Sequence, residues 1–335
     1  MLKKLILLVV LISLSACGEQ DVESQKYQGE ALGTTYAIQF YSEEEIAFEK
    51  GMDSIINQIN KSMSTYSTNS DISKVNRGDT TVKVDAHFLK VLEASRKIYE
   101  ESNGFFDPTV GVLVNAYGFG PEKQINELYT ETLDSLNNLV GLNKISIKKN
   151  GAVSKSTPGV YLDFNAIAKG YAIDVIADYL ESKAVENYLI ELGGELRAKG
   201  KNLKSGNSWL VGIDDPFQKQ ERNLKAKLKL DNASMATSGN YRKYRVDSVS
   251  GRQFVHTVNP ITGFAEKSNL LSATVIAENC MLADGYATAM MAMGLDRTKE
   301  MLNRVDGIEV YLMYSNANGD LQTYISPSLK EKLVK

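Results

Sequence analysis

Two short segments carry polar side chains that an ordinary helix or turn would not need. In the segment LDFNAIAKG, Asp163 and Lys169 flank small residues whose backbone is nearly bare. In the segment ADGYATAM, Asp284 and Thr288 are four residues apart, so both lie on one face of an otherwise apolar helix. Asp163 can simply cap the following helix, Lys169 can face solvent, and Thr288 can bond back to its own helix. Asp284 is harder to explain structurally, because burying an unpaired carboxylate is costly.

The sequence lacks the usual hydrolase and dinucleotide signatures. The stretch GKNLKSGNSW does not have the spacing of a phosphate-binding loop, and YGFGP is too short for a G-x-G-x-x-G turn and ends in proline. His87, His256 and one spare cysteine are too few for a Cys/His metal cluster. A Ser-His-acid triad would have to use His256, and no G-x-S-x-G elbow occurs. These templates therefore leave the polar residues above unexplained.

Nine motifs occur in a fixed order between residue 31 and about residue 325. They are LGTTY, MSTYSTNSDISKVN, GFFDPTVGVLVNAYGFG, LDFNAIAKGYAID, LIELGGELRAKG, VGIDDP, MATSGNYRKY, HTVNPITG and ADGYATAMMAMG. Together they resemble the FAD:protein FMN transferase (ApbE) family of flavin transferases. The resemblance implies transfer of FMN from FAD to a threonine or serine of exported flavoproteins, such as subunits of membrane redox complexes. Two alternatives stay open: an FAD pyrophosphatase that yields FMN and AMP, and a non-catalytic flavin-binding lipoprotein.

The resemblance also implies a magnesium site. Its ligands would be the main-chain carbonyls of Ala166 and Ala287 and the side chains of Asp284 and Thr288. Mg²⁺ prefers hard oxygen ligands and keeps phosphate oxygens or waters in the rest of its shell. Asp163 would contact the flavin nucleotide, and Lys169 would lie near the phosphates, at a helix N-terminus that favours an anion. A target hydroxyl would attack the FMN-side phosphorus and release AMP, while Asp284 would hold the metal or take the proton.

By the same resemblance, a surface for FAD would be lined by Leu32, Tyr66, Tyr117, Gly118 and Phe119. A commoner form of the family carries methionine at position 32 and tryptophan at position 117. Leucine and tyrosine both retain an apolar or aromatic contact there. The alternative for the two tyrosines is burial in the core, since the chain has 17 tyrosines and most must be structural.

The segment HTVNPITG contains the second candidate base. An imidazole titrates near neutrality, so His256 could accept the proton of the attacking hydroxyl, or it could merely bond a backbone carbonyl. The resemblance implies that Val258 touches the nucleotide through its backbone. Asn259 stands where the family usually has aspartate, so this position is uncharged here.

The first residues predict export and lipid anchoring. Two lysines precede the apolar run LILLVVLISL, which is shorter than the ~18 residues that a spanning helix needs. The following LSAC resembles a bacterial lipobox. We expect a signal peptide over 1–16, diacylation of Cys17 and a flexible tether over 17–30, with the protein on the periplasmic side of a bacterial membrane. An uncleaved signal anchor is the alternative. Cys280 is then left without a disulfide partner.

Composition and periodicity predict the elements that must position these residues. Net charge is −3 and hydrophobic content is 43%, so neither nucleic acid nor an anionic surface is expected as a partner. Helical spacing and strand patterns alternate irregularly along the chain, which favours an α+β fold over a doubly wound parallel sheet. Helices are predicted over 47–66, 88–104, 131–141, 166–183 and 281–294, and strands over 31–40, 144–162, 187–200, 208–216, 224–230, 272–278, 305–315 and 321–326. The segment MATSGNYRKY is expected to be a loop. We expect one compact catalytic unit over 31–335, with mixed or antiparallel sheets and flanking helices. A division of this unit into two lobes is the alternative.

Overall fold

The structure is a computed structural model that describes residues 22–125, 128–215, 223–239, 244–246, 253–265 and 268–334. The predicted signal peptide and Cys17 lie outside the described residues. Within these ranges, no helix has the length and apolar character to cross a membrane.

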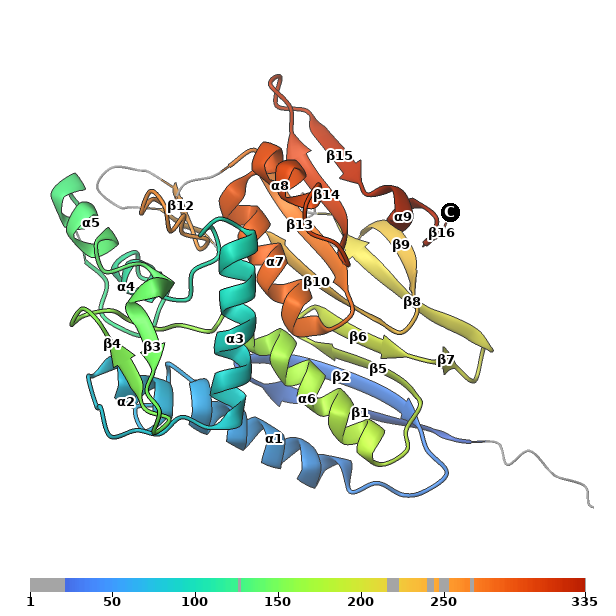
Figure 1. Ribbon diagram of the computed structural model, residues 1–335. Helices are drawn as coiled ribbons and strands as arrows, with labels where there is room; N and C mark the ends of the chain where they lie inside the picture. The colour runs from blue at the N-terminus through green and yellow to red at the C-terminus, as the bar shows by residue number, and fades with distance from the viewer. Residues whose placement is uncertain are drawn as a thin grey trace, which may run out of the picture.

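One eight-stranded sheet forms the centre of the molecule (Figure 1). Its strands, in spatial order, are β1 (Ser24–Ala31), β2 (Thr34–Tyr41), β5 (Asn187–Leu192), β6 (Glu195–Lys199), β10 (Ala233–Gly239), β13 (Leu270–Ala277), β14 (Glu309–Ser315) and β15 (Leu321–Ile325). All seven pairings are antiparallel. This confirms the α+β class and excludes a doubly wound parallel sheet.

Helices cover one face of this sheet. They are α1 (Phe48–Met63), α3 (Ala86–Glu101), α6 (Ala168–Ser182), α7 (Cys280–Met293) and α8 (Leu295–Leu302). In α1 the predicted apolar stripe is buried, including Ile55, Ile59 and Met63. Helix α7 packs on β10 and β13, and α6 packs on β5, β6 and α7. The largest hydrophobic cluster lies between these helices and the sheet.

A smaller antiparallel sheet covers part of the opposite face. It consists of β16 (Leu333–Val334), β9 (Leu224–Leu230), β8 (Asn207–Asp214) and β7 (Lys201–Asn202), with α9 (Pro327–Lys330) beside it. Trp209, Val211 and Leu228 of this sheet are buried together with Met235, Ile276 and Met313 of the central sheet. The body of the protein therefore has three layers.

The remaining short elements lie to one side of the layers (Figure 1). They are α2 (Asp71–Asn76), α4 (Gly111–Ala116), α5 (Thr130–Asn137), a 3₁₀ turn (Leu142–Lys144), the hairpin β3 (Ile145–Ile147) and β4 (Val153–Lys155), and the hairpin β11 (Tyr244–Val246) and β12 (Gln253–Val255). A third, small hydrophobic cluster joins α4, α5 and residues 258–265.

Three predicted boundaries are wrong. The flexible tether cannot extend to residue 30, because β1 begins at Ser24 and pairs along its whole length with β2. Residues 235–239 of the expected loop belong to strand β10, which is held between β6 and β13. Residues 160–164 do not continue the β3–β4 hairpin; Tyr161 forms only an isolated parallel bridge with Val110. In the last two cases, partners distant in sequence determine the backbone conformation.

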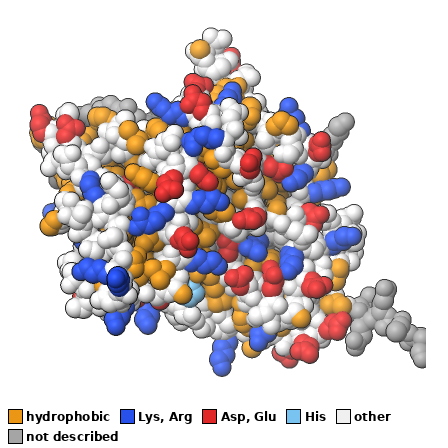
Figure 2. Space-filling view, in the orientation of Figure 1, with side chains coloured by type: hydrophobic (Ala, Val, Ile, Leu, Met, Phe, Trp, Pro, Cys, Tyr) orange, Lys and Arg blue, Asp and Glu red, His pale blue; other side chains and the backbone are white. Residues whose placement is uncertain are grey.

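Charges of both signs are mixed over the surface. On the face that Figure 2 shows, Lys and Arg side chains alternate with Asp and Glu, and no broad region has a single sign.

Candidate active site

Helices α6 and α7 meet at their N-terminal ends and satisfy each other's free backbone groups. The N–H of Gly170, in the first turn of α6, donates to Asp284 Oδ2 of α7 at 3.1 Å. In return, Asp174 of α6 accepts from the N–H groups of Cys280 and Met281, the first two residues of α7, both at 2.9 Å. The first N–H groups of a helix have no partner within the helix, so each carboxylate caps the other helix.

Glycine at position 170 allows this close approach. A Cβ there would lie 2.3 Å from the Cys280 carbonyl oxygen and 2.9 Å from Asp284 Cβ. Real Cβ atoms are not found that near backbone oxygen, so a larger residue would separate the helices. The Lys169-Gly170 pair of the sequence therefore brings the lysine and the buried carboxylate into one place.

Asp284 is buried in this crossing, with 4% of its surface exposed. Burial raises the pKa of its carboxyl group to about 7, and Glu195 and Asp174 act in the same direction. The Lys169 ammonium and the Gly170 N–H oppose the rise. A buried carboxylate with a raised pKa is suited to binding a cation, and the magnesium site that the resemblance implies at Asp284 stays a prediction.

Lys169 is not a freely solvated surface residue. Its ammonium forms an ion pair with Glu195, and its side chain is 30% exposed. Burial alone would lower the pKa of Lys169, but the Asp284 and Glu195 carboxylates outweigh it and raise the pKa above its ordinary range. The lysine is therefore charged at neutral pH and lies between two carboxylates.

Glu195 is a buried charged residue beside Lys169 that sequence reasoning missed. It follows the two-residue turn Gly193-Gly194, whose positive φ angles of 66° and 101° suit a tight hairpin between β5 and β6. The residue is 5% exposed, and its Oε2 atom is buried without a hydrogen-bond partner in the described structure. A charged residue directly after a Gly-Gly hairpin in LIELGGEL was the available signal.

The predicted magnesium ligands differ in how far their oxygen atoms are already used by hydrogen bonds within the protein. No described N–H or side chain donates to the Ala166 carbonyl, which precedes α6, whereas the next carbonyl, of Ile167, accepts from Tyr171. Thr288 is half-buried, and its hydroxyl lies 3.4 Å from Ser238 Oγ of β10. Ala287 lies inside α7, so its carbonyl has only its second lone pair to offer. One carboxylate, one hydroxyl and a free carbonyl are hard oxygen donors of the kind that Mg²⁺ binds. Among the described residues, no three His, Cys, Asp or Glu gather as a metal cluster.

Asp163 lies at the entrance to α6 but does not cap it. Its Oδ1 accepts from the Asn165 N–H at 2.7 Å, and the N-cap of α6 is Ile167. Burial raises the pKa of Asp163, although the Asn165 N–H opposes this. Tyr66 is 66% exposed, and burial and the Asp163 carboxylate raise its pKa. The two residues therefore lie close together, with the tyrosine ring open to solvent rather than in the core.

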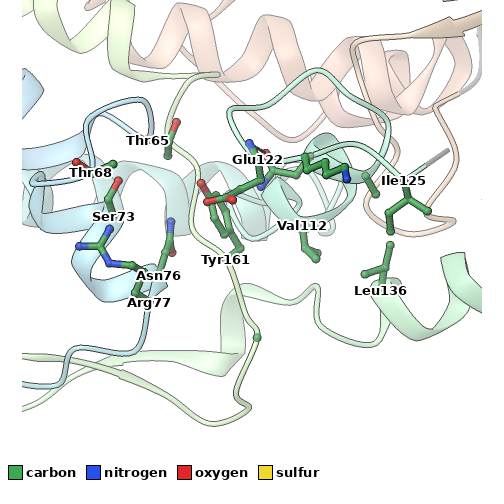
Figure 3. A pocket seen from close by; sticks show the side chains of 14 residues that line it. Thr65, Thr68, Ser73, Asn76, Arg77, Val112, Glu122, Ile125, Leu136 and Tyr161 are labelled. Atoms are coloured by element: carbon green, nitrogen blue, oxygen red, sulfur yellow. Dashed lines mark hydrogen bonds between the residues drawn. The ribbon is translucent and has the colours of Figure 1, made fainter.

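A hollow of about 350 Å³ is lined in part by Tyr161, two residues before Asp163 (Figure 3). Polar side chains line one part of it, including Thr65, Asn76 and Arg77, and apolar side chains the other, including Val112 and Leu136. Tyr161 and Glu122 lie between these parts (Figure 3).

Hydrogen bonds fix the segment that contains both Tyr161, which lines the hollow, and Asp163. Asn76 holds the backbone of Leu162 with two bonds of 2.8 Å, and the Asn165 side chain donates to Thr65 at 3.3 Å. The segment 161–165 therefore has a defined position between α2 and α4.

Tyr117 is buried in the core, which was the alternative to a place on the FAD surface. Its ring is 1% exposed, and its hydroxyl donates to the Gly263 carbonyl at 3.1 Å. This bond and the contact with Val258 join the AYGFG turn to the HTVNPITG loop. Gly118 is exposed and Phe119 is half-buried, so these two residues remain accessible to a ligand, whereas the Tyr117 side chain is not.

The other predicted residues lie in turns around the site. Leu32 sits in the β1–β2 turn with a φ of 51°, a left-handed conformation that is unusual for leucine. His256 directly follows β12 and is half-buried, and its role as base stays a prediction. The Asn259 side chain accepts from the N–H of Ile261 at 2.9 Å, a role that needs an oxygen but no charge.

Comparison with known proteins shows which family the chain resembles over nearly its whole length. The sequence model of the ApbE family matches residues 32–312. A protein named FAD:protein FMN transferase from Haemophilus influenzae is 35% identical over 327 residues, covering 94% of this chain and 93% of that relative. The structure of the flavin transferase ApbE from Vibrio cholerae superposes with a TM-score of 0.82 at 33% identity, covering 93% of this chain and 99% of that one. The flavinyl transferase ApbE of Pseudomonas stutzeri, in its apo form, has a TM-score of 0.81 at 28% identity, with 93% and 97% covered.

Proposed function

The chain belongs to the ApbE family, and we propose that it transfers FMN from FAD to a serine or threonine hydroxyl of another protein. The observation that carries the proposal is the α6–α7 crossing, where a charged lysine and a buried carboxylate lie together at two helix N-termini. Such a place attracts a phosphate group and a cation at the same time. The relatives with this name cover nearly the whole chain.

The proposed reaction exchanges one phosphoester bond for another. The acceptor hydroxyl oxygen forms a bond to the FMN-side phosphorus, and the bond from this phosphorus to the bridging oxygen breaks. AMP leaves with the bridging oxygen, and the hydroxyl proton passes to a base, for which Asp284 and His256 are the candidates. Lys169 would neutralise charge on the diphosphate, which otherwise repels the incoming oxygen.

We propose that Mg²⁺ binds at Asp284, Thr288 and the Ala166 carbonyl, with Ala287 as a weaker donor. When bound, the ion would screen the charge of the two phosphates. The free Ala166 carbonyl and the buried Asp284 carboxylate, whose pKa is raised despite the Lys169 ammonium and the Gly170 N–H, support this assignment.

The hollow that Tyr161 lines supports a place for part of FAD. Small-molecule sites are typically about 300–1,000 Å³, so a hollow of about 350 Å³ has room for one ring system and not for the whole dinucleotide. Its apolar side would contact a ring face, and its polar side would bind edge atoms. Exposed Tyr66 offers a second aromatic surface nearby.

We further propose that the protein acts at a bacterial membrane, facing the periplasm and held by a lipid on Cys17. Exported flavoproteins, such as subunits of membrane redox complexes, would be its acceptors. The support is the N-terminal sequence, with its basic start, short apolar run and LSAC motif.

Incubation of the purified protein with FAD, Mg²⁺ and a candidate acceptor tests the function. Flavin fluorescence that stays with the acceptor under denaturing conditions, together with AMP release, is the expected result. Free FMN with AMP would instead identify an FAD pyrophosphatase, and intact FAD would identify a binding protein. Chelation of Mg²⁺ and the Lys169→Met variant should each suppress transfer, whereas Lys199→Met, a lysine exchange outside the site, should not.

A further inference from the structure

Strand β6 and helix α6 are joined by a row of ion pairs. Glu195, Arg197 and Lys199 alternate along β6 and therefore point to the same side. Their partners on α6 are Lys169, Asp174 and Glu181, respectively. We call these three pairs the α6–β6 ladder. The Arg197–Asp174 contact is 2.5 Å and the Lys199–Glu181 contact is 2.7 Å.

The paired side chains become more exposed to solvent along the ladder. At the inner end, the side chains of Glu195 and Asp174 are 6% and 7% exposed. At the outer end, those of Lys199 and Glu181 are 39% and 32% exposed. Exposed pairs are screened by water, but a buried charge depends strongly on its partner. The two inner pairs can therefore hold geometry, while the outer pair contributes little.

Each inner pair is connected to one group of the proposed reaction. Glu195 holds the ammonium of Lys169. Asp174 is held by Arg197 and in turn binds the N–H groups of Cys280 and Met281, one helical turn before Asp284. The position of α7 along α6, and with it the position of the Asp284 carboxylate, depends on this contact.

We infer that Glu195 and Asp174 are positioning residues: Glu195 sets the place of Lys169, and Asp174 sets the place of Asp284. This inference rests on the proposed function, because the lysine serves the diphosphate and the carboxylate serves the cation. Neither positioning residue needs to touch the substrate. The unpartnered Oε2 of Glu195 is buried, so that atom is closed to a bulky ligand.

The experiment compares Asp174→Asn and Glu195→Gln with the parent protein and with Lys199→Met. Lys199→Met is the matched control, because it removes a ladder charge from the same strand at the exposed end. Binding of Mn²⁺, a probe for the magnesium site, is measured by electron paramagnetic resonance with FAD present. Flavin transfer is measured over a range of Mg²⁺ and FAD concentrations, and thermal unfolding reports the folded fraction.

Asp174→Asn should weaken Mn²⁺ binding about tenfold and should raise the Mg²⁺ concentration for half-maximal transfer by a similar factor. Mutation of residues that orient metal ligands commonly weakens metal binding by such an amount. Glu195→Gln should lower kcat about tenfold without raising the dissociation constant of FAD, because the lysine keeps its charge but loses its fixed place. Lys199→Met should match the parent in Mn²⁺ binding, flavin transfer and thermal unfolding.

Asp174→Asn leaves Arg197 without its carboxylate and could unfold. The double variant Asp174→Asn/Arg197→Met removes both charges, which buried pairs tolerate better than the loss of one. It should fold and still bind Mn²⁺ about tenfold more weakly. Parent-like Mn²⁺ binding and an unchanged kcat in the folded variants would overturn the inference. Failure of the parent itself to transfer flavin would overturn the proposed function, and the Mn²⁺ comparison would still decide the role of Asp174.

Discussion

The backbone N–H of Gly170 donates a hydrogen bond to Asp284, which joins the start of α6 directly to the buried carboxylate of α7. The bond satisfies a helix N–H that has no partner within α6. It also keeps Asp284 beside Lys169, the residue immediately before Gly170. Loss of this contact would separate the two groups that the proposed chemistry needs together.

Gly170→Ala should lower the free energy of unfolding by about 1–3 kcal/mol and abolish flavin transfer. The new methyl group would lie 2.3 Å from the Cys280 carbonyl, a backbone atom that cannot turn away. Gly285→Ala is the matched control, because its methyl group would lie 2.4 Å from the end of the Ile98 side chain, which can shift, and at ordinary contact distance from Ile167. Chemical denaturation and the transfer assay measure both effects. Equal behaviour of the two variants would show that the helix crossing is not tightly constrained.

Asp284→Asn should change the dependence of stability on pH. Without metal, the folded parent keeps a proton on Asp284 up to about pH 7, whereas the unfolded chain releases it near the ordinary value of 3.8. The contribution of this carboxyl group to stability is therefore full below about pH 4 and is lost as the pH rises to about 7. In chelator, the variant should gain stability relative to the parent across this window, by roughly 1.4 kcal/mol per unit of pKa difference at most.

Addition of Mg²⁺ at pH 8 should stabilise the parent but not Asp284→Asn. A cation that binds only the folded state stabilises it by mass action, and the neutral amide is a poor ligand for it. Thermal unfolding at several pH values, with chelator or Mg²⁺, measures both effects. A stability difference that does not vary with pH would contradict the raised pKa.

Tyr66→Ala should raise the dissociation constant of FAD roughly tenfold and change stability by no more than about 0.5 kcal/mol. The ring is 66% exposed, so it contributes little to the core. Tyr117→Phe should instead lower the free energy of unfolding by about 1 kcal/mol, because it removes the buried hydrogen bond to Gly263. It should leave the dissociation constant of FAD unchanged. Quenching of flavin fluorescence and chemical denaturation distinguish the two. Weak FAD binding by Tyr117→Phe would show that its side chain does serve the ligand.

Thiol counting should test the predicted lipid anchor. Cys280 is fully buried, and burial raises the pKa of its thiol well above the ordinary value of 9.0. Native protein extracted from membranes should therefore have no reactive thiol if Cys17 carries a lipid, and one after denaturation. Two thiols after denaturation would show that Cys17 is unmodified.

Local pattern was sufficient to determine the helices that carry the candidate site and the face on which some of its side chains lie. The apolar periodicity of α6 and α7 gives their limits within two residues, since each helix buries one long segment between sheet and neighbours. The i, i+4 spacing places Asp284 and Thr288 on one face whatever else the chain does. The β5–β6 turn is also visible, because Gly-Gly permits the positive φ angles that a two-residue hairpin requires.

Tertiary packing alone decided which groups meet. Glu195 reaches Lys169 only because β6 pairs between β5 and β10 and turns alternate residues toward α6. Tyr117 is buried because the distant loop around Gly263 covers it, whereas Tyr66, equally aromatic, stays open. Residues 233–239 become a strand because two partners flank them. Sequence spacing sets the direction of a side chain within its own element, but contacts between elements depend on long-range pairing that no local pattern contains.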